Sequence, residues 1–344
     1  MKRHILLVIG TVIIALLAGC GKDKGAGGSK AMSYVPESAT AVVTIDVGRI
    51  LSDPSVQEFL EEPLAEMSRE MAQKMDSSLL SPYDIGQVVI FTTEDLASMG
   101  IAGPQRLTIA VSFAKEVPLD IVDSLAGFPM DKRAASGGQP YLANDAQQLY
   151  MCAPEDNIWL VSPNEAVIAH LATGEKPEAD EMSKESAAPA LMKEMAADEG
   201  LMAALSFDIS ESERPDLGPM AEMLAQDTSN PELAQVAEFA PVLQQAISTI
   251  NSAGFSLGRK DDQFVLATQM RFADQETAEE IRQALIMMLS FAGGEVTRRE
   301  LGFAKDIIDR VDITTSQQTV SVSVTVSDSD IEEAQRAVAE LDEI

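Results

Sequence analysis

The feature of this chain that most constrains its fold is an alternating strand pattern that occurs twice. Segment 41–47, AVVTIDV, matches segment 203–209, AALSFDI, without a gap, and both carry an aspartate second from the end. Two further segments repeat in the same order at an offset of about 160 residues, namely 106–113 with 265–272 and 158–162 with 323–327. Collinear repeats at a nearly constant offset indicate a body made of two related halves.

The spacing of strands and turns within each half predicts the fold class. Short turn sequences at 154–157, 260–262 and 317–318 separate neighbouring strand patterns, and tight turns join antiparallel strands. Period-two alternation indicates that one face of each sheet is covered by helices. We therefore expect an α+β fold of two related halves, each a mainly antiparallel sheet with helices packed on one face.

Helix boundaries are indicated by capping residues and proline. Asp53 followed by Pro54 is typical of an N-cap and first helical turn, and we interpret Ser162 and Ser327 as N-caps in the two halves. The helical patterns beyond residue 53 cover 118–125, 164–172, 232–250 and 275–289.

The first twenty residues carry the clearest functional signature of the sequence. A basic start, Lys2 and Arg3, precedes the apolar run 5–17, which is too short to span a bilayer and is typical of an export signal. The run ends in Leu-Ala-Gly-Cys at 17–20, which resembles the lipobox of bacterial lipoproteins. That resemblance implies cleavage after residue 19 and a diacylglycerol thioether on Cys20. The alternative is an ordinary secretory signal in which Cys20 is incidental.

This interpretation divides the chain into five parts. We expect a lipoprotein signal peptide at 1–19, the lipidated cysteine and a flexible tether at 20–32, a first α+β repeat at 33–174, a linker at 175–186 and a second repeat at 187–344. The resemblance implies a cell-envelope protein that faces the periplasm or the exterior. Gly21 in place of aspartate favours the outer over the inner membrane of a Gram-negative cell.

The organisation is also similar to that of uncharacterised duplicated α+β envelope lipoproteins. The similarity rests on the lipobox, on the opening YVPESA at 34–39 and on the duplicated strand. It implies no activity for this chain.

Charge and cysteine content exclude several classes of protein. The net charge of −30 repels nucleic acid, so we expect no nucleic-acid partner. A hydrophobic content of 46% is too high for a disordered stalk and suffices for sizeable cores. Once Cys20 is lipidated only Cys152 remains, so no disulfide can form within the chain. The apolar run 149–152 predicts that Cys152 is a buried structural thiol.

Candidate catalytic groups are few. The two histidines are His4, which leaves with the signal, and His170, for which we expect a surface or packing role. The sequence contains no nucleophile elbow, zinc-binding helix, phosphate loop or dinucleotide motif, and we expect no enzyme activity, metal or cofactor. Asp46 and Asp208 hold equivalent places in the duplication. They could form a carboxylate pair for acid–base work or a cation, or each could cap the following helix.

The predicted function is binding within the envelope, by a membrane-anchored and non-catalytic interaction module. The membrane is contacted through the lipidated N-terminus, and the partner is another envelope protein or a small ligand. Seventeen methionines leave open a carrier or sensor of an apolar ligand in a Met-lined cavity, although their helical spacing favours packing. A carboxylate-dependent envelope hydrolase is the remaining alternative.

Overall fold

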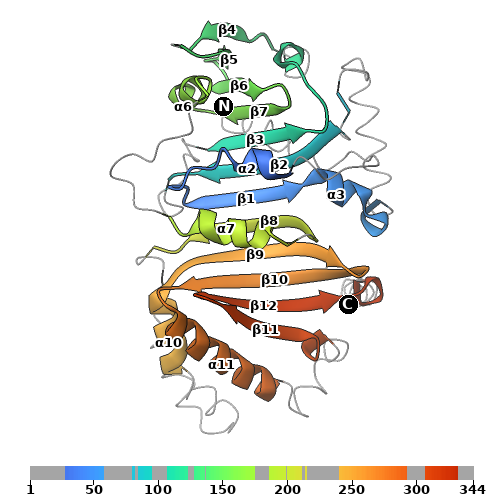
Figure 1. Ribbon diagram of the computed structural model, residues 1–344, viewed down its shortest axis with the longest axis vertical. Coiled ribbons are helices and arrows are strands. Elements are labelled where there is room, and N and C mark those ends of the chain that lie inside the picture. Colours follow the sequence, from blue (N-terminus) through green and yellow to red (C-terminus); the bar gives the residue numbers. More distant parts are fainter. Residues whose placement is uncertain are drawn as a thin grey trace, which may run out of the picture. The chain divides into compact units, whose positions relative to one another are not determined.

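The structure, a computed structural model, divides the chain into two compact units, Met1–Pro189 and Ala190–Ile344, which are considered separately (Figure 1). The boundary follows the predicted linker, most of which lies outside the described residues. The structure describes residues 28–57, 80–81, 84–94, 107–122, 128–135, 137–174, 186–198, 200–210, 214, 240–292 and 307–331.

The described residues of the first unit form seven antiparallel strands in the order β1-β2-β3-β7-β6-β5-β4. The strands are β1 (Ala41–Asp46), β2 (Ile85–Thr92), β3 (Thr108–Phe113), β4 (Asp131–Ala134), β5 (Pro140–Asn144), β6 (Leu149–Glu155) and β7 (Ile158–Ser162). Their helical elements are α2 (Gly28–Met32), α3 (Val47–Ser52), the 3-10 turn η3 (Leu119–Ile121) and α6 (Glu165–Leu171). The first unit is thus an α+β structure, as predicted.

Both faces of the first sheet are covered by helical elements. On one face, α3 and η3 contribute to a core that includes Val88, Val111 and Trp159. The opposite face contacts α2 and α6, and the Tyr141 hydroxyl there donates a hydrogen bond to Glu165 of α6. Helices on a single face were expected, so this detail of the prediction was wrong. The strands are apolar on both sides and each side needs cover.

In the part of the second unit that the structure describes, five antiparallel strands follow the order β8-β9-β10-β12-β11. The strands are β8 (Leu201–Asp208), β9 (Ile250–Lys260), β10 (Gln263–Phe272), β11 (Val311–Ser316) and β12 (Thr319–Val326). The helices are α7 (Ala188–Ala196), α10 (Ala240–Thr249) and α11 (Gln275–Ala292). Both hairpins turn at the predicted residues, with positive φ at Asp261, Asp262 and Gln317.

Helices also lie on both faces of the second sheet. Helix α7 packs on one face, where Met195 contacts Gly254 so closely that a Cβ at this glycine would lie 2.7 Å from the methionine methyl. Helices α10 and α11 cover one end of the other face through a small core that includes Phe272, Ile281 and Val320. The strand register places α7 and α11 on opposite faces, because Arg271 and Thr319 contact Glu194 of α7 while Val320 packs in the α11 core.

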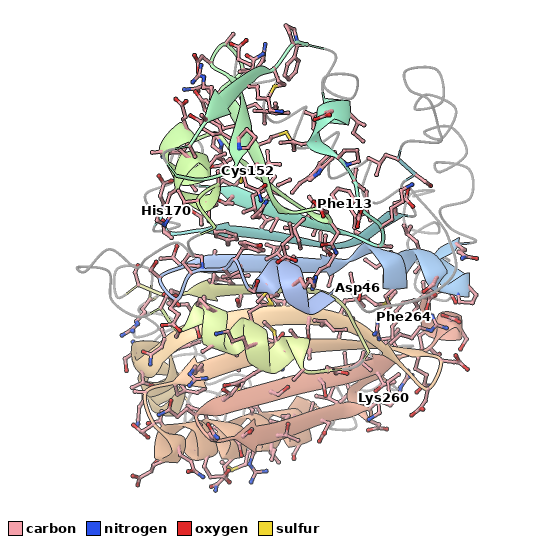
Figure 2. All side chains as sticks on the ribbon, turned by 45° about the horizontal axis from the view of Figure 1, so that its top comes forward. Asp46, Phe113, Cys152, His170, Lys260 and Phe264 are labelled. Atoms are coloured by element: carbon pink, nitrogen blue, oxygen red, sulfur yellow. The ribbon has the colours of Figure 1, made fainter. Side chains whose placement is uncertain are left out.

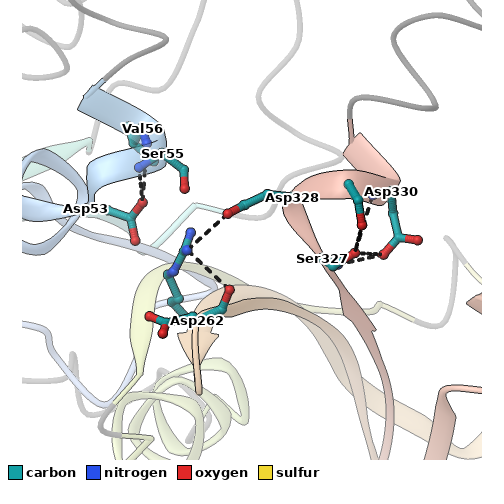
Figure 3. Close-up of polar contacts among 9 residues, drawn as sticks. Asp53, Ser55, Val56, Asp262, Ser327, Asp328 and Asp330 are labelled. Carbon is teal, nitrogen blue, oxygen red and sulfur yellow. Dashed lines mark hydrogen bonds and ion pairs between the residues drawn. The ribbon is translucent and has the colours of Figure 1, made fainter.

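The predicted helix caps are largely confirmed. The Asp53 carboxylate accepts hydrogen bonds from the amides of Ser55 and Val56, and the Ser327 hydroxyl accepts one from the Asp330 amide (Figure 3). In the first half the N-cap is Asn164 and not Ser162, whose hydroxyl instead accepts from the Asn164 amide. A residue two places closer to the helix thus replaces the predicted cap.

Several predicted boundaries were wrong. The helix expected over 118–125 is only the short turn η3 within the described residues, and Ile250 begins β9 instead of ending a helix. Residues 28–32 of the predicted flexible tether form α2, in which Ala31 is fully buried. Strands β4 and β5 were not predicted. In the described part of the chain, no helix combines the length and the hydrophobicity that crossing a bilayer requires.

Candidate functional site

Asp46 has a structural role at the end of β1. Its carboxylate accepts a hydrogen bond of 2.9 Å from the Arg49 amide and thereby caps α3, and Arg49 Nε lies 3.7 Å from the other carboxylate oxygen. Burial raises the pKa of Asp46, an effect that the Arg49 amide and guanidinium oppose. The capping alternative is therefore realised for this residue.

Asp208 occupies the corresponding end of β8 in the second unit, where it pairs in register with Ser252 of β9. The two candidate aspartates thus lie in separate units. Within the described residues, no group of three or more histidine, cysteine or acidic side chains could hold a metal ion. The geometry supplies no metal centre that includes Asp46 or Asp208.

The structure describes one of the cysteines, Cys152, and the remaining histidine, His170. Cys20 lies outside the described residues. Cys152 is a fully buried free thiol in β6, and burial raises its pKa to about 12 (Figure 2). His170 lies half-buried in the last turn of α6. A thiol that stays protonated at neutral pH is no nucleophile, so the structural interpretation of Cys152 is supported.

A polar network in the first unit escaped the sequence analysis. Arg133 of β4 pairs with Asp145 and with Glu165, while the Tyr141 and Tyr150 hydroxyls donate to Glu165 and Asp145 at 2.8 and 3.0 Å. Hydrogen bonds from Arg133 hold the pKa of both carboxylates below their usual values, whereas burial raises the pKa of both tyrosines. No member is poised to take up or release a proton near neutral pH, so the network fastens β4, β5 and α6 together.

A second unpredicted polar contact fixes the N-terminal helix. Glu155 of β6 accepts a hydrogen bond of 3.1 Å from the Tyr34 hydroxyl and forms an ion pair of 3.1 Å with Lys30 of α2. Burial, followed by the charge of Glu155, raises the pKa of Tyr34. These contacts and the buried Ala31 attach α2 to the first unit.

Among the residues that the structure describes, an apolar sheet face in the second unit carries large exposed side chains. The side chains that the strand register directs to the same side of the sheet as α10 and α11 include Leu205, Phe255, Leu257, Leu266, Val322 and Val324. We call this set the open face. Phe255 is 50% exposed and Leu266 45% exposed, and none of the six is fully buried.

The helices stop short of this part of the sheet. Their core includes Ala253 and Val320, and Phe207 and Met270 pack against it, so the helices that the structure describes cover only one end of the strands. The ring of Phe207 stacks on that of Phe255 at 6.4 Å between centroids, which marks the transition from covered to uncovered sheet. Ile286 and Met287 on the outer side of α11 are also exposed, so all four exposed large hydrophobic residues of the described chain lie in the second unit.

The corresponding face of the first unit is fully packed. Val88 and Val111, at the centre of its sheet, are 1% and 5% exposed, and Trp159 donates a hydrogen bond of 2.9 Å to the Val117 carbonyl. Two sheets of similar composition thus differ in how completely their apolar faces are covered. Large contiguous patches of exposed apolar surface mark sites of interaction with proteins, membranes or ligands.

A positively charged group ends the open face. Arg259 follows Phe255 and Leu257 on the same side of β9, and its guanidinium lies 4.6 Å from the centre of the Phe264 ring. The same guanidinium donates to the Asp262 carbonyl at 3.2 Å and lies 3.4 Å from Asp328 (Figure 3). Phe264 and Lys260 mark this end of the β9–β10 hairpin in Figure 2. The apolar face therefore ends at a guanidinium that is 15% exposed and already paired with Asp328.

The strands of the open face show an ordinary alternation of apolar residues, but the sequence alone could not show that this face is exposed. Alternation shows that one side of a strand is apolar, but which residues a helix covers depends on where the helix crosses the sheet. The methionines whose helical spacing favoured packing lie elsewhere: Met192 and Met195 are buried and Met287 of α11 is exposed. Met67, Met71 and Met75 lie outside the described residues.

Comparisons with known proteins give neither a family nor a named relative. No family model matches the chain, and no curated protein matches it. Among solved structures, crystal forms I and IV of TP0453 are similar, with TM-scores of 0.36 and 0.39 and identities of 8% and 9%. They cover 90% and 87% of this chain and 96% of the TP0453 chain in each case. At this level of similarity the neighbours identify no function.

Proposed function

We propose that this protein is an exported lipoprotein, anchored to a membrane through acylated Cys20, which acts by binding and not by catalysis. The lipobox supports the anchor, and the open face carries the binding assignment. Half-exposed Phe255 and Leu266 lie on the same side of neighbouring strands, in diagonal positions of the β9–β10 register. We further propose the cell envelope as its location, with the outer membrane favoured if the cell is Gram-negative, and an envelope protein or a small ligand as its partner.

The strand orders of the two units support the proposal that the halves are related by duplication. In the first unit β1-β2-β3-β7-β6 are neighbours in that order, and in the second unit β8-β9-β10-β12-β11 repeat it. The three repeated sequence segments fall on the strands that this alignment equates, namely β1 with β8, β3 with β10 and β7 with β12. Strands β4 and β5 are then an addition to the first half.

The anchor is tested by labelling cells with radioactive palmitate. The parent chain and the matched control Cys152→Ala should incorporate label, and Cys20→Ala should not. Globomycin, which inhibits lipoprotein signal peptidase, should cause the unprocessed precursor to accumulate. Label in Cys20→Ala, or processing that ignores globomycin, would refute the anchor.

The open face favours the second candidate function, a carrier or sensor of an apolar ligand. Its lining is phenylalanine, leucine and valine instead of methionine, so we transfer this candidate from a Met-lined cavity to the sheet surface. The hydrolase candidate gains no supporting observation. It predicts that Asp46→Asn and Asp208→Asn abolish turnover of envelope polymers, whereas a capping role predicts only a change in stability.

A further inference from the structure

We propose that each unit binds one ordered water molecule beside its repeated aspartate, Asp46 in the first unit and Asp208 in the second. The inference goes beyond the proposed binding function, because neither the anchor nor the open face enters it. It starts from two buried polar atoms that find no hydrogen-bond partner among the described residues, Gln87 Oε1 and Ser252 Oγ. Ordered water is the usual partner of such atoms inside folded proteins.

The two atoms hold the same place in the two sheets. Gln87 of β2 pairs in register with Asp46 of β1, and Ser252 of β9 pairs in register with Asp208 of β8. Both aspartates belong to the repeated strand pattern, and the strand following each of them carries the buried polar residue. A feature that occurs at the same position in two sheets is part of the fold and not a local accident of packing.

In the first unit the surroundings supply the partners that a water needs. Gln87 is 7% exposed, and its amide nitrogen donates to the Thr44 hydroxyl at 2.8 Å. One carboxylate oxygen of Asp46 accepts from the Arg49 amide, while the other lies 3.7 Å from Arg49 Nε, beyond hydrogen-bond length. Directly paired residues of antiparallel strands have Cβ atoms about 5 Å apart on the same face. One water can therefore donate to the Asp46 carboxylate and to Gln87 Oε1.

The opposite orientation of the Gln87 amide leads to the same result. Turning the amide over exchanges its oxygen and nitrogen, so that Thr44 would donate to the oxygen and the nitrogen would lack a partner. Water both donates and accepts, so it satisfies either atom. The proposed site does not depend on which way the amide lies.

In the second unit the water contacts a serine. Ser252 is fully buried on the side of the sheet that α7 covers, two residues before Gly254, which contacts Met195 of α7. Its neighbours on the adjacent strands are Asp208 and Arg271, which the register places on the same side of the sheet. A water beside Ser252 can accept from the serine hydroxyl and donate to the Asp208 carboxylate.

A crystal structure tests both sites directly. The mature chain with Cys20→Ala, which removes any covalent lipid, should show one ordered water about 3 Å from the Gln87 amide and another about 3 Å from Ser252 Oγ. Water at only one of these positions, or at neither, would overturn the proposal of a repeated site. Direct hydrogen bonds from Gln87 or Ser252 to a protein group would overturn it equally.

Stability distinguishes a hydrated hydroxyl from a dry one in the same Cys20→Ala chain. If water binds Ser252, Ser252→Ala removes a satisfied hydrogen bond and should raise the equilibrium constant of unfolding about fivefold. A dry hydroxyl would give an unchanged or lower constant, because alanine removes a group that is costly to desolvate. This outcome would refute the water in the second unit.

The matched control for that measurement is Ser256→Ala. Ser256 lies on the same side of β9 as Ser252 but is partly exposed, so this substitution should change the constant by less than about twofold. Urea unfolding followed by far-ultraviolet circular dichroism measures both variants. An equal increase in the two variants would show that loss of any serine hydroxyl in β9 explains the effect, and would refute the specific role of Ser252. Palmitate labelling of Cys20 is independent of these results.

Discussion

Replacing Phe113 by leucine should destabilise the first unit by about 2 kcal/mol. Phe113 is 3% exposed, and its ring meets that of Trp159 edge to face, with 4.8 Å between centroids and 67° between planes. Such a pair contributes about 0.5–1.5 kcal/mol beyond the area it buries. The smaller side chain also leaves unfilled volume in a packed core, at a further cost of about 1 kcal/mol.

Phe255→Leu is the matched control in the second unit. Phe255 is 50% exposed and stacks on Phe207 at 6.4 Å, so the same substitution removes little buried area and a weaker ring contact. We expect a loss below about 0.5 kcal/mol, which is typical of surface positions.

Urea unfolding measures both variants. Trp159 is the only tryptophan of the chain and lies in the first unit, so its fluorescence follows the unfolding of that unit. Far-ultraviolet circular dichroism follows both units, and midpoints are compared at unchanged slope. Similar losses for the two variants would refute the argument, because Phe255 would then behave as a core residue and the open face would not be available for a ligand.

Three further predictions follow from buried or paired groups. Cys152, whose pKa burial raises to about 12, should resist Ellman's reagent in a Cys20→Ala chain until denaturant is added; rapid reaction of the native protein would contradict its burial. Glu155→Gln removes the ion pair with Lys30 and should accelerate tryptic cleavage after that residue, whereas the exposed control Glu276→Gln should not. Hydrogen bonds, chiefly from Arg282, lower the pKa of Glu279 from 4.5 to about 2, so the carboxylate adds stability above about pH 4.5 that is lost as the pH falls towards 2. Glu279→Gln should flatten this part of the acid-unfolding curve, and an unchanged curve would show that the pairing adds nothing.

Much of the fold could be predicted because its signals are local. Asp53 before Pro54 identifies a helix start from two adjacent residues, and the hairpin at Asp261 and Asp262 follows from turn chemistry alone. Strands β1 and β8 were visible because an alternating pattern of apolar residues can be recognised in sequence.

The features that could not be predicted depend on contacts between distant residues. Strand β4 has the sequence DKRA, without alternation or β-branched residues, and is held by pairing with β5 and by Arg133. Residues 28–32 look like a linker because the partner that orders them, Glu155, lies far along the chain. The open face also depends on contacts between distant residues, because the length and placement of α10 and α11 help to determine which part of the sheet is exposed.

The attachment of α2 limits how far the proposed anchor lets the protein travel. If Cys20 is acylated, only eight peptide units connect it to Gly28, and eight residues extend to at most about 30 Å. With a connection this short, α2 and the first unit to which it is attached stay close to the membrane surface that holds Cys20. Molecules that dissolve in or leave that same leaflet are thus its nearest neighbours.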